Sequence, residues 1–208
     1  MIKLVFVDFS RTLVKQSGCN SGADVIGKGD TYRALYPEYK AGKISIDELL
    51  TKTFACWKGL EVSDLPKVCE KFEFNEGAEE TVRQIKQMGI KTALLTNIPT
   101  HLAEVFAKKL GFDSYTGTVL EVKDGVFTGK VLELNNDKRK EALTILEREK
   151  IAPGEAIAIG DTKEDARVFE KIRFGVAFNG DEAARKAAKY QITDFRDLVE
   201  IIEKENKN

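Results

Sequence analysis

The sequence predicts an α/β protein with a doubly wound parallel sheet, into which a small helical cap domain and a β-hairpin are inserted. Two observations carry this prediction. Short apolar runs rich in β-branched residues alternate with amphipathic segments, which is the pattern of a parallel sheet covered by helices on both faces. At 208 residues with 42% hydrophobic content, the chain can also bury one substantial core and a small second domain.

The elements of the sheet domain follow in order along the chain. Strands are predicted at residues 2–8, 90–96, 155–160 and 174–178. Helical spacing of apolar residues predicts helices at Gly77 to Met88, Pro99 to Leu110, Asp137 to Lys150, Thr162 to Ile172, Asp181 to Lys189, and from about Asp194. Pro99 just inside a helix start, and Gly89 and Gly111 just past helix ends, are typical helix boundaries. Residues 1–14 and 77–208 are therefore expected to form a Rossmann-like core.

Two segments interrupt this alternation. Residues 15–76 begin with a glycine-rich stretch and continue as helical pieces at 31–40, 46–58 and 63–72, without a strand for the sheet. We expect an inserted helical cap domain on a flexible neck. Residues 116–134 form two alternating segments joined at Lys123-Asp124-Gly125, which predicts a β-hairpin.

Composition and charge exclude several classes of function. Lys and Arg number 33 and Asp and Glu 34, so no excess of positive charge exists to bind nucleic acid or an anionic membrane. Three scattered cysteines and a single histidine do not supply the ligands of a zinc site, and they favour a reducing cytoplasm. The first apolar run is broken by Lys3, so we expect no signal peptide and a mature chain that begins at Met1.

Polar residues that suit one anion follow three of the predicted strands. Asp8 closes the first strand, Thr96-Asn97 follows the second, and Asp161 comes directly after Gly160. Because ligands bind at the carboxyl ends of parallel strands, these groups are expected to meet at one edge of the sheet. Asp161 and Asp165 add carboxylates four residues apart at a helix start, and oxygen ligands of this kind hold Mg²⁺.

Four motifs in this order carry a resemblance to a known family. They are Asp8-Phe9-Ser10-Arg11-Thr12-Leu13, Leu95-Thr96-Asn97, a basic residue within Lys138-Arg139-Lys140, and Gly160-Asp161-Thr162-Lys163-Glu164-Asp165. Together with the insertion after the first motif, residues 76–81 and the hairpin at 122–129, they resemble the phosphoserine phosphatase-like branch of the haloacid dehalogenase superfamily. The resemblance covers nearly the whole chain.

The resemblance implies phosphoryl transfer through an aspartyl phosphate. Asp8 would attack the phosphorus, and Mg²⁺ would be held by Asp8, the backbone carbonyl of Ser10 and Asp161, with Asp165 as a supporting ligand or in the surrounding shell. The metal offsets the repulsion between a carboxylate and an anionic phosphate. The expected substrate is a small phosphorylated metabolite, and the expected enzyme is a cytoplasmic hydrolase.

The remaining phosphate oxygens would be held by Thr96, the amide of Asn97 and one cation. We assign that cation to Lys138, which follows Asn136-Asp137 at a helix start, although Arg139 fits the helical spacing as well. The choice between the two stays open at this stage.

Departures from the family pattern bear directly on activity. Ser10 stands where the phosphatases carry a second aspartate, which protonates the leaving oxygen and then activates water. Losing a general acid/base typically lowers the rate by about 10² to 10⁴, so we expect Mg²⁺ and phosphate binding with slow turnover. Arg11 replaces a glycine that is usual in many relatives. Ser17 and Thr51 align with the glutamate and arginine with which phosphoserine phosphatases bind the amino acid, which argues against phosphoserine.

Other interpretations of the same residues stay open. The chain could be a catalytically impaired module that binds a phosphorylated ligand or a partner protein, or a switch that is phosphorylated on Asp8 and hydrolysed slowly. Taken singly, Asp8 could cap a turn, and Asp161 and Asp165 could complement a helix dipole. His101 is expected on a helix surface, and Phe54 and Trp57 in the core of the cap.

Overall fold

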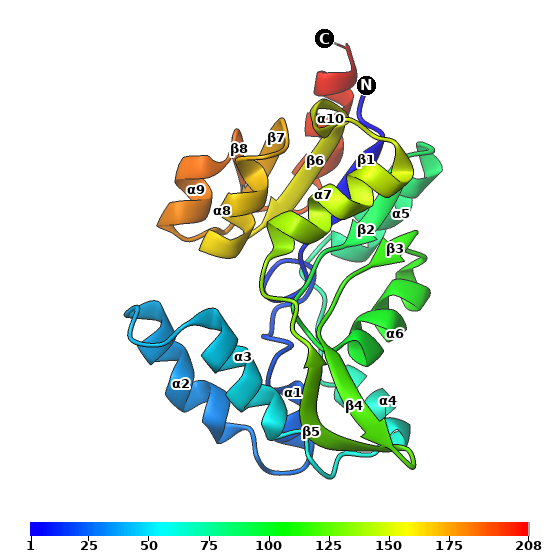
Figure 1. Cartoon of the computed structure of the whole chain (residues 1–208). Helices are drawn as coiled ribbons and strands as arrows, with labels where there is room; N and C mark the ends of the chain where they lie inside the picture. The colour runs from blue at the N-terminus through cyan, green and yellow to red at the C-terminus, as the bar shows by residue number, and fades with distance from the viewer. Residues whose placement is uncertain (208) are drawn as a thin grey trace.

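The structure, a computed structural model, describes residues 1–207 and contains one six-stranded parallel sheet (Figure 1). Its strands, in the spatial order β3-β2-β1-β6-β7-β8, are β1 (Leu4–Val7), β2 (Lys91–Leu94), β3 (Ser114–Tyr115), β6 (Ala156–Gly160), β7 (Phe174–Phe178) and β8 (Tyr190–Ile192). The central strand β1 pairs with β2 and β6 in a register that places Val7 opposite both Leu94 and Ile159. The carboxyl ends of the three central strands therefore lie level with one another.

Helices cover both faces of this sheet, as the alternating pattern predicts. They are α5 (Ala78–Gln87), α6 (Thr100–Leu110), α7 (Lys138–Glu149), α8 (Lys163–Phe169), α9 (Glu182–Ala187) and α10 (Asp197–Lys207). Alternate residues of β1 point to opposite faces: Val5 and Val7 pack with α5, α6 and α10, whereas Leu4 and Phe6 pack with α7 and α8. A short 3-10 helix, η2 (Pro153–Glu155), precedes β6.

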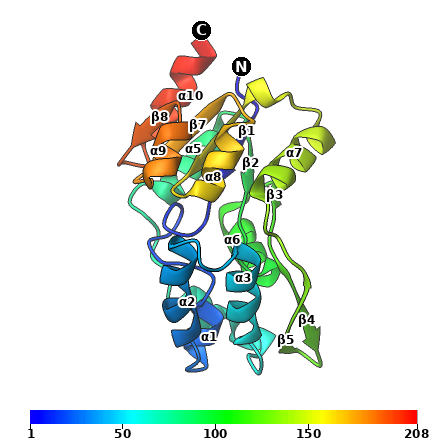
Figure 2. The same cartoon turned by 60° about the vertical axis from the view of Figure 1, so that its left-hand side comes forward.

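A second group of helices lies between β1 and α5 in the sequence and beyond the carboxyl edge of the sheet in space (Figures 1 and 2). They are α1 (Ser21–Val25), α2 (Asp30–Lys40), α3 (Ile46–Ala55), the 3-10 helix η1 (Val62–Asp64) and α4 (Leu65–Cys69). Helices α2 and α3 pack side by side. Ser45 caps α3 by accepting a hydrogen bond from the Glu48 N–H, and this fixes where the helix begins.

The predicted hairpin is present as β4 (Val119–Lys123) and β5 (Val126–Glu133). Its turn residues Asp124 and Gly125 both have positive φ angles, as a two-residue hairpin turn requires. The hairpin packs on the helical insertion: the Gly59 N–H donates to the Phe127 carbonyl, and the rings of Trp57 and Phe127 meet edge to face at 5.5 Å. The hairpin and the helices therefore share one apolar core.

Several details differ from the sequence-based expectations. The short edge strands β3 and β8 were not predicted. The glycine-rich stretch contains helix α1, and two of its glycines lie in close packing: a Cβ at Gly18 would lie 2.6 Å from Ile98, and one at Gly22 would lie 2.6 Å from the Trp57 ring. These glycines are needed for close approach, which the prediction of a flexible neck did not anticipate. Among residues 1–207, no helix has the length and apolar character that a membrane crossing requires.

Candidate active site

The three acidic residues predicted to converge do so at the carboxyl edge of the sheet. Oxygen atoms of Asp8, Asp161 and Asp165 all lie within 4.8 Å of one another, and all three residues belong to buried or largely buried positions. Asp8 is fixed at the end of β1 because its N–H donates to the Ile159 carbonyl of β6. Three carboxylates in one small volume form an all-oxygen donor set, which fits a hard divalent cation such as Mg²⁺.

Lys138 is the cation that contacts this cluster. As the first residue of α7, it donates to Asp8 Oδ1, and its Nζ lies 2.9 Å from Asp165 Oδ1. Arg139 instead binds Asp137, the N-cap residue of the same helix, at 2.8 Å. Of the two basic residues that the sequence left as candidates, the structure therefore places Lys138 against Asp8.

Asp165 orients the loop that carries Asp161. Its Oδ2 accepts hydrogen bonds from the N–H groups of Asp161 and Thr162 and from the Thr162 hydroxyl, at 2.8–3.2 Å. Gly160 is required beside it, since a Cβ there would lie 2.3 Å from the Asp165 carboxyl carbon. Oδ2 of Asp165 therefore takes part in capping the start of α8, while Oδ1 faces Lys138.

Burial and mutual repulsion make it unfavourable for all the carboxyl groups of this cluster to be ionised together. Burial raises the pKa of the Asp8 carboxyl to about 6, against the opposing effect of Lys138. Burial, with the charges of Asp8 and Asp165, raises the pKa of Asp161 to about 8. Burial alone would lower the pKa of Lys138, but Asp165 and Asp8 raise it, so the ammonium stays charged. Additional positive charge between Asp8 and Asp161 would relieve the repulsion between these carboxylates.

The Thr96-Asn97 loop is held in place by polar residues that the sequence analysis did not single out. The Thr96 N–H donates to Thr116 Oγ1 at 2.9 Å, and the Thr96 carbonyl accepts from Asn135 Nδ2 at 2.8 Å. The Thr118 hydroxyl donates to the Asn97 carbonyl at 3.0 Å. In the sequence, these residues were marked only by the alternation of Thr116 and Thr118 just before the hairpin. That pattern is too weak to assign a role.

Asn97 Oδ1 is buried without a hydrogen-bond partner among residues 1–207. Thr96, Asn97, Asp8, Lys138 and Asp161 all line one pocket, which encloses about 560 Å³ of empty space, part of it open to solvent. The predicted phosphate-binding residues and the acidic cluster therefore face the same space.

Known proteins resemble this chain in sequence and in fold. Residues 5–170 match the haloacid dehalogenase-like hydrolase family. The chain belongs to that family. It is 29% identical to the phosphoserine phosphatase of Archaeoglobus fulgidus over 92% of its length, although it spans only 56% of that relative. It is also 29% identical to the phosphoserine phosphatase of Idiomarina loihiensis, covering 96% of this chain and 91% of the relative.

A solved structure described as a phospho-aspartyl intermediate analogue of phosphoserine phosphatase has the same fold. It superimposes with a TM-score of 0.84 at 27% identity, covering 96% of this chain and 98% of that one. The predicted resemblance to the phosphoserine phosphatase-like branch is thus confirmed, as are the α/β fold and the hairpin. The family supports a phosphohydrolase, and the buried acidic residues could hold the metal that such enzymes use.

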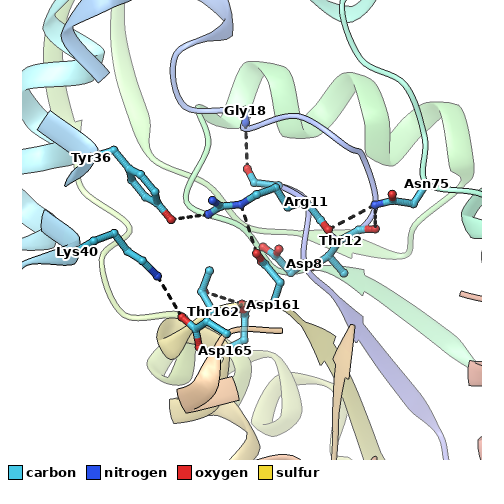
Figure 3. A network of polar contacts seen from close by, with 12 residues as sticks. Asp8, Arg11, Thr12, Gly18, Tyr36, Lys40, Asn75, Asp161, Thr162 and Asp165 are labelled. Carbon is cyan, nitrogen blue, oxygen red and sulfur yellow. Dashed lines mark hydrogen bonds and ion pairs between the residues drawn. The ribbon is translucent and has the colours of Figure 1, made fainter. Parts of the chain in front are cut away.

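Ser10 and Arg11, the two residues of the first motif predicted to depart from the family pattern, both have defined contacts. Ser10 Oγ accepts a hydrogen bond from the Gly18 N–H at 3.0 Å. Arg11 adopts a φ of 61°, a left-handed conformation in which glycine is preferred. Its Nε lies 3.3 Å from Asp161 Oδ2, and its Nη2 donates to the Tyr36 hydroxyl at 2.8 Å (Figure 3). Arg11 therefore links helix α2 to the acidic cluster.

One further expectation needs revision, and the position of Thr51 can now be stated. Thr51 is exposed and does not line the pocket, because the buried face of α3 is formed by Leu49, Leu50 and the residues one turn later. Its alignment with an amino-acid-binding arginine stays a prediction. His101 is half-buried against the Phe127 ring and not on a free helix surface, because the hairpin covers this part of α6. Phe54 and Trp57 are fully buried, as expected.

Proposed function

We propose that this protein is a Mg²⁺-dependent phosphohydrolase that acts on a small phosphorylated metabolite through an aspartyl phosphate on Asp8. The observation that carries the proposal is the placement of Asp8 at the end of the central strand, within 4.8 Å of two further carboxylates and bonded to Lys138. A reducing cytoplasm is the proposed compartment, because none of the three cysteines forms a disulfide.

In the proposed reaction an Asp8 oxygen attacks phosphorus and the bond from phosphorus to the ester oxygen breaks, so that the alcohol leaves with a proton taken from solvent. Water then cleaves the aspartyl phosphate, which releases inorganic phosphate and restores Asp8. Lys138 fixes the orientation of the Asp8 carboxylate through Oδ1 and would also neutralise charge on a phosphoryl oxygen. The Thr96 hydroxyl and the groups of Asn97 would bind the other oxygens. Buried donors that are already in position stabilise a transition state without having to reorganise.

The metal site of the proposal consists of Asp8, the Ser10 carbonyl, Asp161 and Asp165. Bound Mg²⁺ would lower the repulsion between the nucleophile and an anionic phosphate. Arg11 and Lys138 already neutralise Asp161 and Asp165 in part. Removing divalent cations with a chelator should therefore abolish hydrolysis without unfolding the protein.

We also propose a division of the chain into a core of residues 1–14 and 77–208 and a cap of residues 15–76. Helices α2 and α3 of this cap line the pocket opposite the acidic cluster. Tyr39 donates to Glu164 of the core, and Lys40 approaches Asp181 at 3.4 Å. The cap would thereby keep water out of the site and select the substrate.

The test is hydrolysis of p-nitrophenyl phosphate in Mg²⁺. Asp8→Asn should lower kcat by at least about 10³-fold, since an amide cannot act as the nucleophile. Asp113→Asn is the matched control, because Asp113 is a carboxylate bonded to Thr92 and Lys86 away from the site, and it should retain activity. Undiminished hydrolysis by Asp8→Asn, with Mg²⁺ present, would refute the proposal.

A second candidate function follows from Ser10. A serine hydroxyl cannot exchange a proton with the leaving group or with water near neutral pH, and here it is engaged by the Gly18 N–H. In this alternative the protein binds a phosphorylated ligand or partner and turns over little. Calorimetry that shows binding, with no released phosphate over hours, would favour it over the hydrolase.

A further inference from the structure

The pocket has two parts of different chemical character. The phosphate end consists of Asp8, Thr96, Asn97, Lys138 and Asp161. The opposite part, which we call the helical wall, comes from α2 and α3 and consists of Tyr32, Tyr36, Tyr39, Ile46, Leu49 and Leu50. A ligand whose phosphate lies on Asp8 must place its organic part against this wall.

The tyrosines of the wall present mainly ring surface to the pocket, because two of the three hydroxyls already take part in hydrogen bonds within the protein. Tyr32, Tyr36 and Tyr39 recur at helical spacing along one face of α2. The Tyr36 hydroxyl accepts from Arg11 at 2.8 Å, and the Tyr39 hydroxyl donates to Glu164. The rings of Tyr32 and Tyr36 are stacked with centroids 5.2 Å apart. What they offer a ligand is therefore mainly apolar and aromatic surface.

Helix α3 adds aliphatic surface. Ile46 is half-buried and lines the pocket, and Leu49 and Leu50 are packed behind it one turn later on the same side of the helix. Burying apolar ligand surface against such side chains is favourable by roughly 25 cal/mol per Å². The same surface offers nothing to a charged group taken out of water.

The charged residues that line the pocket are all engaged. Its bases are Arg11, paired with Asp161, and Lys138, paired with Asp8. Among residues 1–207, the one other acidic residue that lines the pocket is Glu164, which accepts a hydrogen bond from the Tyr39 hydroxyl. A substrate ammonium or carboxylate entering the helical wall would therefore lose its hydration without finding a free counter-charge.

We infer that the substrate is a phosphate monoester whose organic part is uncharged and largely apolar or aromatic, and not the phosphate of a zwitterionic amino acid. This inference rests on the proposed function and specifies its substrate class. A neutral hydroxyl is compatible with it, because the Ser17 hydroxyl lines the pocket beside Tyr32 and Cys19.

The first test compares two esters with the same three-carbon skeleton, n-propyl phosphate and O-phospho-L-serine. In Mg²⁺, we expect kcat/KM to be at least about 100-fold higher for n-propyl phosphate, because only phosphoserine carries charges into the wall. Equal values or a preference for phosphoserine would overturn the inference. Hydrolysis of p-nitrophenyl phosphate in the same assay shows that the proposed function itself holds.

If the protein does not turn over, binding of the same two esters can still be compared. If p-nitrophenyl phosphate is not hydrolysed, the proposed function fails, and calorimetry of the same two esters with Mg²⁺ then tests the substrate class. Tighter binding of n-propyl phosphate supports the inference, and tighter binding of phosphoserine overturns it.

A pair of variants locates the preference in the helical wall. Ile46→Arg places a cation on a half-buried residue that lines the pocket, whereas Thr51→Arg adds the same cation to an exposed residue of the same helix that does not. Ile46→Arg should shift the ratio of kcat/KM values toward phosphoserine by about tenfold, because it supplies a partner for the carboxylate. Thr51→Arg should leave the ratio unchanged. An equal shift in both variants, or none in Ile46→Arg, would contradict the role of the wall.

Discussion

The phosphate end of the pocket and the helical wall differ in how the fold positions their side chains. Asp8, Thr96 and Asp161 follow three adjacent parallel strands, and the register of β1 with β2 and β6 sets their spacing. The wall comes from two helices that are held over this edge through side chains, including the contacts of Tyr36 and Tyr39. Backbone pairing fixes the first part, and side-chain packing fixes the second.

The two parts also treat charge differently. The phosphate end concentrates buried carboxylates around Lys138, whereas the wall is neutral. The phosphate end can therefore keep its chemistry while the side chains of α2 and α3 change, because those changes do not disturb the strand ends. The difference teaches that the family supports a phosphohydrolase here, while the substrate class is inferred from the wall.

The largest effect that we predict tests whether the wall stays closed over the phosphate end. Cys19 is half-buried and lines the pocket, and burial raises the pKa of its thiol to about 12 against the opposing effects of Lys138 and Arg11. Only the thiolate is alkylated, so Cys19 should react with iodoacetamide at pH 8 about 10³-fold more slowly than a free thiol. The rate should rise about tenfold per pH unit up to pH 10 without a plateau, as expected below the pKa.

Mass spectrometry of the Cys19 peptide measures this rate, and the protein in urea supplies the unprotected rate. Cys19→Ser identifies the peptide signal. A rate near that of the unfolded chain would mean that the helical wall moves away often, and that side-chain packing does not hold the wall over the phosphate end.

The next effect concerns the phosphate end alone. Ser10→Asp should raise kcat for n-propyl phosphate by about 10²-fold, because it restores a group that can protonate the leaving oxygen and activate water. An aspartate can keep the present contact, since its carboxylate can accept the hydrogen bond from the Gly18 N–H. The gain should be smaller for p-nitrophenyl phosphate, whose leaving group needs no proton.

Ser17→Asp is the matched control, because it adds a carboxylate to another serine that lines the pocket without placing it in the first motif. It should give no comparable gain. If Ser10→Asp also fails to raise kcat, the missing acid is not what limits turnover, and the phosphate end has diverged in more than one residue.

The sequence predicted the phosphate end better than the wall, for a physical reason. Asp8, Thr96 and Asp161 each follow a short, largely apolar run, and buried parallel strands leave such a run little alternative structure. Their convergence then follows from the geometry of parallel sheets. The assignment of Lys138 over Arg139 stayed provisional, because the directions of adjacent side chains at a helix start are known only once the helix is placed.

The parts that escaped prediction depend on packing between distant segments. Strands β3 and β8 have two and three residues, too few to show a period. The alternation of Thr116 and Thr118 gained its meaning only from contact with the Thr96-Asn97 loop. The tyrosines of α2 are visible as a helical stripe, but a stripe does not show whether it faces a core or a ligand. Gly18 and Gly22 suggested flexibility because the side chains that approach them are remote in sequence.

The smallest effect that we predict concerns Arg11, which joins the two parts by contacting both Tyr36 and Asp161. Its guanidinium occupies one oxygen of a proposed metal ligand, so it competes with a divalent cation. Arg11→Gly should tighten Mg²⁺ binding, measured by calorimetry, on the order of tenfold, a modest change because a partly exposed ion pair is screened by water.

Lys150→Gly is the matched control for Arg11→Gly. Lys150 is also a basic residue with a positive φ, 58°, but it ends α7 on the exposed surface. Both variants relieve the left-handed backbone strain, so both should gain a little stability from that source. Only Arg11→Gly should change Mg²⁺ affinity. Equal affinities in the two variants would mean that Arg11 does not compete for Asp161, and that the wall and the phosphate end bind their ligands independently.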